Sequence, residues 1–352
     1  MSVFGLGIEL DGEGSHPASW RRANHPPSES LSGRTLLARV RAAENAGFTL
    51  ATFDDSIVPP RGDVRARVDA VNRASFVAAA TSTIGLVPVV ETTYAEPFHT
   101  ASQLATLDYA SRGRGGWIAA RARDAAIARA WGRPAVRADD LDREQRDSVT
   151  VVRALWDSWE DDAVIRDYAT GRFLDRDKLH YVDFEGESFS VKGPAIVPRP
   201  PQGQLVVFGT GADQPLVDVV LVVESEREAA VAAAQRSPGL AFVEVSVALD
   251  LAGVTAAERL AELDRHHPAQ TPSRLQYVGP PGGLVDLLDD LARHADGVRL
   301  FPAVIDEDLP VLARYVLPAL FRSGVAHRPV PGSSLRDNLG LARPSNRHAR
   351  TP

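Results

Sequence analysis

The sequence predicts a single α/β domain built as an eight-stranded TIM (β/α)8 barrel, and two observations predict this fold. Short apolar runs alternate along the chain with segments whose apolar residues recur every three to four positions. That alternation is typical of parallel strands separated by helices. Clusters of polar residues also follow two of the apolar runs directly, at 54–56 and at 91–94. Barrel enzymes carry their chemistry at the carboxyl ends of strands, so these clusters indicate where a site would lie.

Eight apolar runs are interpreted as the barrel strands, at residues 3–8, 50–53, 84–90, 116–119, 205–209, 217–223, 242–249 and 298–301. Helices are expected between the first of these strands, at residues 33–46, 74–81, 97–109 and 140–158. Gly47 follows the first of these helices and supplies a stop signal, and Pro97 opens the third. The elements therefore follow the strand–helix order that a parallel barrel requires.

The connection between the fifth and sixth strands is too short for this pattern. Only the segment GTGADQPL separates the end of the fifth strand near Gly209 from the start of the sixth near Val217. A parallel crossover normally needs a dozen or more residues and a helix. Either the sixth strand pairs unusually, or the barrel has lost a helix on this side.

Residues 1–326 are expected to form one barrel domain. Within it, residues 159–204 are polar and contain two short alternating patches, which predicts an excursion with a hairpin over the barrel rim. Residues 327–352 are rich in Pro, Arg and Ser and are expected to pack on the surface or against a partner subunit.

Composition excludes several classes of function. The net charge of −7 is spread along the chain and disfavours nucleic-acid binding. The absence of cysteine excludes disulfides, thiolate metal ligands and thiol catalysis, and is compatible with the cytoplasm, where we expect the protein. No apolar stretch approaches the roughly 18 residues that cross a bilayer, and no secretory signal is recognised. No metal site is expected either, because the adjacent pair His266 and His267 points in diverging directions.

Four segments carry a family resemblance. They are HPASWR at 16–21, VPVVETTYAEPFHTASQLATLDYASRGRGGW at 87–117, the stretch from VVRALW to PRPPQGQ at 151–204, and SSLRDNLGLARPSNR at 333–347. Together they resemble the bacterial-luciferase-like flavin monooxygenases, in the branch that includes nitrilotriacetate monooxygenase. The matches extend from near the amino terminus to near the carboxyl terminus.

The resemblance implies a luciferase-like barrel that takes reduced FMN from a separate flavin reductase and oxygenates a small organic substrate. Homodimers are common in this family. Asp55, Thr92 and Thr93 fall on family positions near the flavin, and Trp117 borders the same pocket. His16 falls on a loop histidine near the substrate and is the candidate general acid/base.

The chain departs from the family at several cofactor positions. Ile118 stands where the family has a polar strand end, and Ala138 and Asp142 replace a histidine and a tyrosine. The helix that would bind the flavin phosphate after Gly211 has no room in the short connection. These departures support a second hypothesis: a barrel that has lost flavin binding and serves as a non-catalytic partner subunit or a cofactor-free biosynthetic protein.

Structural roles also remain open for the candidate residues. Asp55 lies in the series Asp54-Asp55-Ser56, which could cap a helix instead of contacting a ligand. A loop histidine beside proline, such as His16, often only packs the loop. Arginines near the fourth strand, Arg121 among them, could bind a phosphate or carboxylate, or form a solvated surface.

Overall fold

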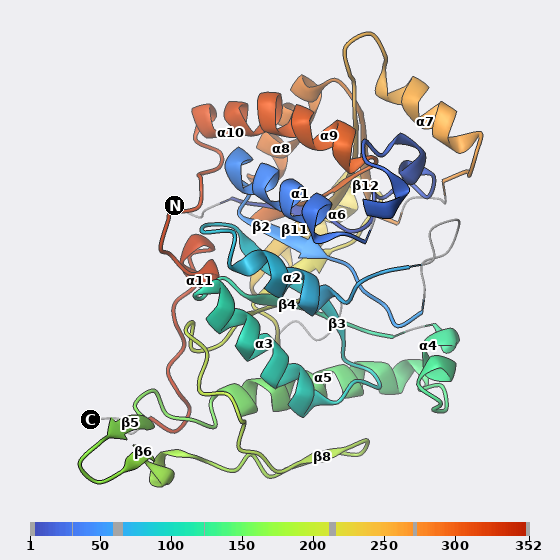
Figure 1. Cartoon of the computed structure of the whole chain (residues 1–352). Helices are drawn as coiled ribbons and strands as arrows, with labels where there is room; N and C mark the ends of the chain where they lie inside the picture. The colour runs from blue at the N-terminus through green and yellow to red at the C-terminus, as the bar shows by residue number, and fades with distance from the viewer. Residues whose placement is uncertain are drawn as a thin grey trace.

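Eight parallel strands close into a barrel surrounded by helices (Figure 1). The computed structural model describes residues 4–29, 31–58, 66–122, 124–210, 216–269 and 273–349. Around the barrel the strand order is β10-β9-β4-β3-β2-β1-β13-β11, and pairing of β11 with β10 closes the ring. The strands are β1 (Gly5–Glu9), β2 (Leu50–Phe53), β3 (Gly85–Glu91), β4 (Gly116–Ala120), β9 (Val206–Gly209), β10 (Val219–Val222), β11 (Leu240–Leu249) and β13 (Gly297–Pro302).

The predicted TIM barrel is thus confirmed, with all eight expected strands in place. One further strand, β12 (Leu275–Gly279), pairs in parallel with the second half of β11 and was not predicted. The first half of β11 pairs with β10, which has only four residues. The rest of that edge of β11 would have no partner without β12, so the added strand satisfies its backbone hydrogen bonds.

Helices follow most of the strands on the outside of the barrel. Those around the barrel are α1 (Gly33–Ala46), α2 (Ala70–Ala78), α3 (Pro97–Ser111), α4 (Ala125–Ala130), α5 (Ala138–Trp156), α6 (Arg227–Gln235), α7 (Ala256–Asp264), α8 (Pro281–Leu291), α9 (Ile305–Val311) and α10 (Leu317–Ser323). A π-helical turn, Leu312–Val316, joins the last two, and short 3-10 helices occupy Ser19–Arg22, Pro27–Glu29 and Arg176–Lys178. None of the described helices combines the length and apolar character needed to cross a membrane.

The short connection joins two neighbouring strands of the ring. β9 and β10 pair in parallel, with Phe208 opposite Val219, so residues 210–218 make the whole crossover. Residues 211–215 lie outside the described residues. The Asp218 carboxylate accepts a hydrogen bond from the backbone N–H of Val207, and its own N–H donates to the carbonyl of Val207. Asp218 therefore fastens the start of β10 to β9 at the point where the chain returns.

Alternation along the strands divides the apolar residues into an inner and an outer core. Inward-facing residues of six strands pack together inside the barrel, and they are Leu50, Val87, Val89, Ile118, Val206, Phe208, Val219, Leu221 and Phe242. The residues between them face the helices and form two larger clusters. Side chains alternate across a strand, so a single register fixes which residues fill the barrel.

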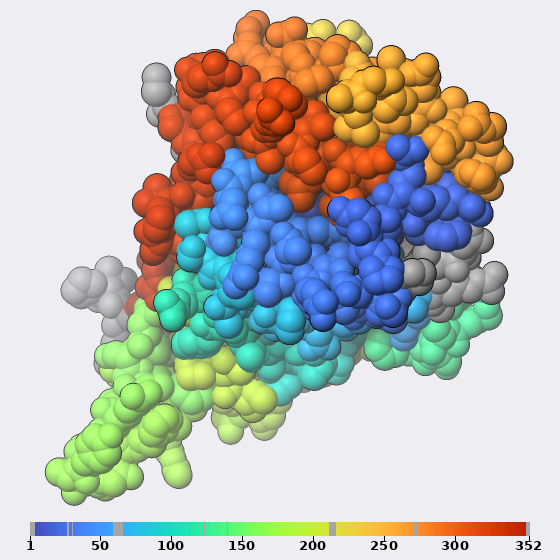
Figure 2. Space-filling view, turned by 45° about the horizontal axis from the view of Figure 1, so that its top comes forward, coloured from blue at the N-terminus to red at the C-terminus, as the bar shows by residue number. Residues whose placement is uncertain are grey.

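The excursion at 159–204 begins and ends at the amino-terminal end of the barrel. It leaves from the carboxyl end of α5 and returns to the start of β9, and its first part projects from the body (Figure 2). Its second part runs back along α5, where Glu187 pairs with Arg143. Its two hairpins pair β5 (Val164–Asp167) with β6 (Arg172–Leu174), and β7 (Phe184–Glu185) with β8 (Ser190–Val191). Both ends of the excursion therefore lie opposite to the strand ends where chemistry is expected.

The described part of the carboxyl-terminal tail reaches into the barrel as well as along its side. α11 (Leu335–Asn338) inserts Leu335 and Leu339 into the inner core, where a Cβ on Gly85 would come within 2.6 Å of Leu335. The tail then runs to the base of the excursion (Figure 1), where Asn346 donates to the carbonyls of Asp157 and Trp159. The tail therefore plugs the amino-terminal end of the barrel.

Candidate functional site

The carboxyl ends of the strands hold a buried ionic cluster inside the barrel. Arg299 of β13 donates to Glu244 of β11 at 2.7 Å, to the hydroxyl of Thr52 at 2.9 Å, and to Glu9 of β1. All four side chains are buried. Burial alone would lower the pKa of Arg299, but the carboxylates of Glu244 and Glu9 more than offset it and raise that pKa. The guanidinium is therefore a fixed cation that closes the barrel beneath the mouth.

Above this cluster two carboxyl groups titrate close to neutrality. Burial, followed by the charges of Glu9 and Asp11, raises the pKa of Asp54 to about 6, although its side chain keeps 53% of its surface exposed. Burial, and then the charges of Asp55 and Asp54, raise the pKa of Glu91 to about 7. A carboxyl group with a pKa near the working pH can both accept and release a proton. The mouth thus holds two candidate acid/base groups.

Sequence reasoning placed Asp54 and Glu91 in the polar clusters at the strand ends but gave them no acid/base role, and it missed Glu9, Glu244 and Arg299. A signal was present, because Glu9 and Glu91 occupy inward-facing register positions at the carboxyl ends of apolar strands. An acidic residue at such a position must lie inside the barrel mouth. The cation that pairs with Glu9 is Arg299, which lies 290 residues further along the chain.

Asp55, expected at the flavin, is held as a cap. One oxygen accepts the N–H of Ser56 at 2.8 Å, and the other accepts the N–H of Ala70, the first residue of α2, at 2.6 Å. Desolvation raises the pKa of this carboxyl, and the hydrogen bond from Ala70 opposes the rise. Both oxygens of Asp55 are therefore already hydrogen-bonded within the chain, as in the capping role that the sequence left open for this residue.

Thr92 and Thr93 are buried at the junction of β3 and β4. The hydroxyl of Thr92 donates to the carbonyl of Ala120 at 2.8 Å. The hydroxyl oxygen of Thr93 accepts the N–H of Ala122 at 3.4 Å. These bonds fasten the two strand ends together and place both threonines beside Glu91.

Trp117 lies on the outer face of β4. It is fully buried, its indole N–H donates to the carbonyl of Val90 at 3.2 Å, and its ring meets Trp156 of α5 edge-on with centroids 6.4 Å apart. Its neighbour Ile118 points the other way, into the inner core. Trp117 therefore packs the helix layer and does not face the barrel interior.

His16 is buried away from the threonines, against α7. Its Nδ1 accepts the N–H of Ala18 at 3.1 Å, so the neutral ring carries its hydrogen on Nε2, which lies 3.2 Å from a carboxylate oxygen of Asp264. The structure therefore brings Asp55, Thr92 and Thr93 to one side of the mouth but holds His16 on a separate segment. The Nε2 side of its ring faces Asp264, whose side chain is half-exposed.

The departures from the family pattern gather on α5 and β4. Ala138 is the first residue of α5, and Asp142 pairs with Arg121, whose side chain is only 7% exposed. Arg121 also donates to the carbonyl of Thr210 at 2.9 Å, so it links the ends of β4 and β9. Arg121 is therefore a buried arginine whose carboxylate partner is partly exposed, an arrangement in which a phosphate could replace that partner.

Two acceptor oxygens beside this ion pair have no hydrogen-bond partner among the described residues. They are Oε2 of Glu144 and Oε1 of Gln145, and both side chains are buried. Gln145 meanwhile donates to the carbonyl of Ala119 at 2.6 Å. Hydroxyl groups of a bound molecule would satisfy these oxygens, and FMN offers both ribityl hydroxyls and a phosphate. The donor and acceptor set around Arg121 therefore fits FMN.

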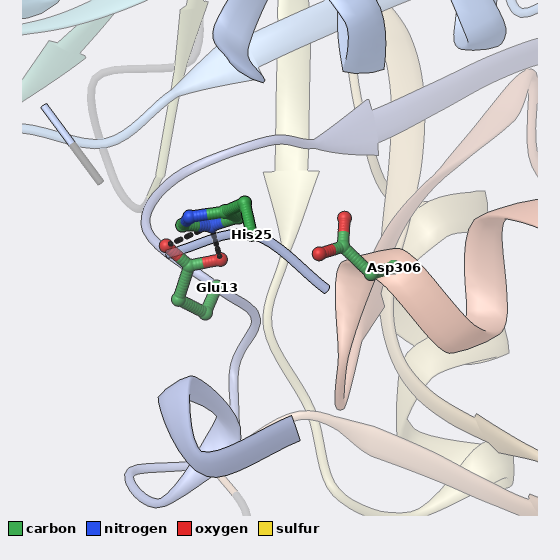
Figure 3. Close-up of side chains that lie close together, drawn as sticks. All are labelled: Glu13, His25 and Asp306. Carbon is green, nitrogen blue, oxygen red and sulfur yellow. Dashed lines mark hydrogen bonds and ion pairs between the residues drawn. The ribbon is translucent and has the colours of Figure 1, made fainter. Parts of the chain in front are cut away.

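A second cluster has metal-ligand chemistry but already contains a cation. Potential ligand atoms of Glu13, His25 and Asp306 lie within 4.8 Å of one another (Figure 3). Arg39 donates to Glu13 and, at 2.8 Å, to Asp306, so its guanidinium neutralises the two carboxylates. The cluster therefore fastens the 10–32 segment to α1 and α9, and we assign it no metal.

Comparison with known proteins identifies relatives for nearly the whole chain. A model of the luciferase-like monooxygenase family matches residues 14–235. One subunit of the pristinamycin IIA synthase of Streptomyces pristinaespiralis is 33% identical, covering 90% of this chain and 92% of its own. Nitrilotriacetate monooxygenase component A of Aminobacter aminovorans is 27% identical, covering 97% of each chain. Its alignment runs over 443 positions, so it carries segments that the 352-residue chain lacks.

The fold is shared with solved structures at lower identity. A riboflavin lyase superposes with a TM-score of 0.80 at 22% identity, covering 98% of this chain and 97% of its own. The predicted resemblance to the luciferase-like proteins, including the nitrilotriacetate monooxygenase branch, is confirmed by these matches.

Proposed function

Because this chain belongs to the luciferase-like monooxygenase family, we propose that it uses reduced FMN from a separate flavin reductase to oxygenate a small organic substrate. The observation that carries the proposal is the family match over residues 14–235, which spans the mouth residues of β2 to β4 and α5. The nitrilotriacetate monooxygenase component is named as one component of an enzyme, which fits a separate reductase. We expect the reaction to take place in the cytoplasm.

In this proposal the chain holds FMN between β4, β9 and α5. Arg121 would bind the phosphate in place of Asp142, and the free oxygens of Glu144 and Gln145 would accept hydrogen bonds from ribityl hydroxyls. Asp55, Thr92 and Thr93 would border the ring through the strand ends that they hold together. When bound, reduced FMN supplies the electrons that activate dioxygen.

The remaining steps depend on proton transfer and on the exclusion of water. Glu91 and Asp54 would exchange protons with the reacting groups, because the pKa values of about 7 and 6 place both near neutrality. Below them, Arg299 with its two carboxylates closes the barrel to water. His16 remains the candidate acid/base on the substrate side, through Nε2.

Titration with FMN and with reduced FMN tests this proposal directly. Binding is followed by flavin fluorescence and by calorimetry, for the native protein, for Arg121→Gln and for Arg129→Gln as an exposed control on α4. We expect micromolar binding that weakens about tenfold in Arg121→Gln, equivalent to about 1.4 kcal/mol, and stays unchanged in Arg129→Gln. Absence of binding up to millimolar flavin would reject the proposal.

A second candidate is a non-catalytic partner subunit of a two-subunit monooxygenase. Two observations favour it: Asp55, Thr92 and Asp142 are engaged within the chain, and the 33%-identical relative is itself named as a subunit of a synthase. This candidate predicts no flavin binding and a chain that associates with a different luciferase-like subunit. The flavin monooxygenase, in contrast, is expected to be a homodimer, so light scattering of the purified chain separates the two candidates further.

A further inference from the structure

A cavity of about 480 Å³ lies beside the mouth, between the 10–32 segment and the amino-terminal ends of α1 and α2. The residues that line it come from four stretches of the chain: 10–17, 19–20, 31–39 and 66–76. None of the residues proposed to hold FMN lines it, but His16, the candidate acid/base of the substrate side, does. Its volume is in the range of small-molecule sites, which run from about 300 to 1,000 Å³. It therefore adjoins the substrate side of the proposed function and is large enough for an organic molecule.

One part of the wall is apolar and exposed to solvent. Leu31, Val68 and Phe76 keep 53%, 41% and 56% of their surfaces accessible, and all three line the cavity. The ring of Phe76 lies over Gly33, where an added Cβ would come within 2.4 Å of it. Large apolar side chains gathered around one cavity are a feature of ligand sites, because a bound apolar group would remove them from water.

The same wall contains hydrogen-bond donors without partners. The indole N–H of Trp20, the hydroxyl of Ser32 and the Nε–H of Arg73 are buried and find no partner among the described residues. A buried donor left unpaired costs about 1–3 kcal/mol. Three such donors around one cavity indicate a missing acceptor.

The charges of the wall agree with a ligand that accepts hydrogen bonds. Arg67 and Arg73 both pair with Asp11, and Arg39 pairs with Glu13, so three arginines face two carboxylates in the wall. Desolvation raises the pKa of Asp11, while Arg73 opposes this rise. Arg39 also bonds Asp306, and Arg67 lies 3.8 Å from Asp54, so carboxylates balance these arginines. What the wall offers a ligand is therefore the unpaired Nε–H of Arg73, together with the other N–H and O–H donors.

From these observations we propose that the cavity binds a small organic anion with an apolar, ring-sized body and a carboxylate-type oxygen group. The apolar body would lie against Leu31, Val68 and Phe76. The oxygen group would accept hydrogen bonds from Trp20, Ser32 and Arg73. This assignment does not depend on flavin, and it is tested on the flavin-free protein.

Calorimetric titration with naphthalene-2-carboxylate provides the test, and naphthalen-2-ylmethylammonium is the matched ligand of opposite charge. We expect the carboxylate to bind at least tenfold more tightly than the ammonium. Phe76→Asp is expected to weaken carboxylate binding at least tenfold, whereas Phe173→Asp, an exposed aromatic on the excursion, leaves it unchanged. Trp20→Phe and Ser32→Ala each remove one donor and are expected to weaken binding about threefold to tenfold.

Three results would overturn the assignment. One is no binding of the carboxylate at millimolar concentration, and a second is equal binding of the ammonium. The third is equal loss of binding in Phe76→Asp and Phe173→Asp. Circular dichroism of each variant checks that it is folded, and Ser32→Ala keeps the donor test available if Trp20→Phe unfolds. Because FMN is absent throughout, failure here is distinguishable from failure of flavin binding.

Discussion

Replacement of Arg299 by methionine removes the one cation that bonds both Glu9 and Glu244 among the described residues inside the barrel. Methionine keeps an unbranched apolar stem but has neither the guanidinium nor a charge, so the change leaves two buried carboxylates without their shared partner. Loss of one member of a buried ion pair typically destabilises by about 3–5 kcal/mol. Glu244 keeps Arg274 at 3.2 Å, and Glu9 keeps the Thr52 hydroxyl at 2.8 Å. We therefore expect about 3 kcal/mol, at the lower end of that range.

Urea unfolding followed by circular dichroism measures this loss. With a urea dependence of about 3 kcal/mol/M, the midpoint is expected to fall by about 1 M in Arg299→Met. Arg274→Met is the control: its side chain is 28% exposed and stacks on Phe301, so we expect less than about 1.5 kcal/mol.

Equal effects of the two variants, or a loss below about 1 kcal/mol in Arg299→Met, would refute this account. Either result would mean that the carboxylates find other partners or water when the guanidinium is removed.

Three further predictions concern the mouth, the 10–32 segment and the tail. The pKa of Glu91 is about 7 in the folded protein against 4.5 ordinarily, so the folded state keeps a proton that the unfolded state releases. The free energy of unfolding of the native protein should therefore fall between pH 4.5 and 7, relative to that of Glu91→Gln, by on the order of 1 kcal/mol after solvent screening. Urea titrations across that pH range measure this difference. Gly14→Ala should lower stability by about 2 kcal/mol or more in thermal melts, because φ is +137° and a Cβ would lie 2.3 Å from the carbonyl oxygen of Ala303. An unchanged melting temperature would contradict that contact. Leu335→Ala should cost about 2–5 kcal/mol in urea unfolding if the tail plugs the barrel, and near zero if it only lies on the surface.

Much of the barrel could be predicted from local patterns. Apolar runs such as 84–90 and 116–119 lie within one residue of the observed strands at one end or both, and the helix at 33–46 matches α1 at both ends. Strand alternation and helix spacing depend on neighbours within a few residues, so the sequence carries this information. β12 escaped prediction because the five residues LQYVG form no continuous apolar run and because its role depends on the short length of β10.

The candidate site divides differently between sequence and structure. Polar residues at strand ends were recognised from their position, but what each one contacts was not. Asp55 caps α2, Trp117 faces outward against Trp156, and Asp142 pairs with Arg121. Each of these contacts joins residues from separate elements, and the partner is chosen by how the elements pack.

By itself, the sequence determined the strand and helix pattern, the TIM barrel and the membership of the luciferase-like family. Only the tertiary structure decided which carboxyl groups titrate near neutrality and which donors lack partners among the described residues. Those properties arise from burial and from charges that the barrel brings together across long sequence separations, such as Glu9 beside Arg299. A sequence pattern cannot predict these properties, because the free energy of a charged group depends on its neighbours in space.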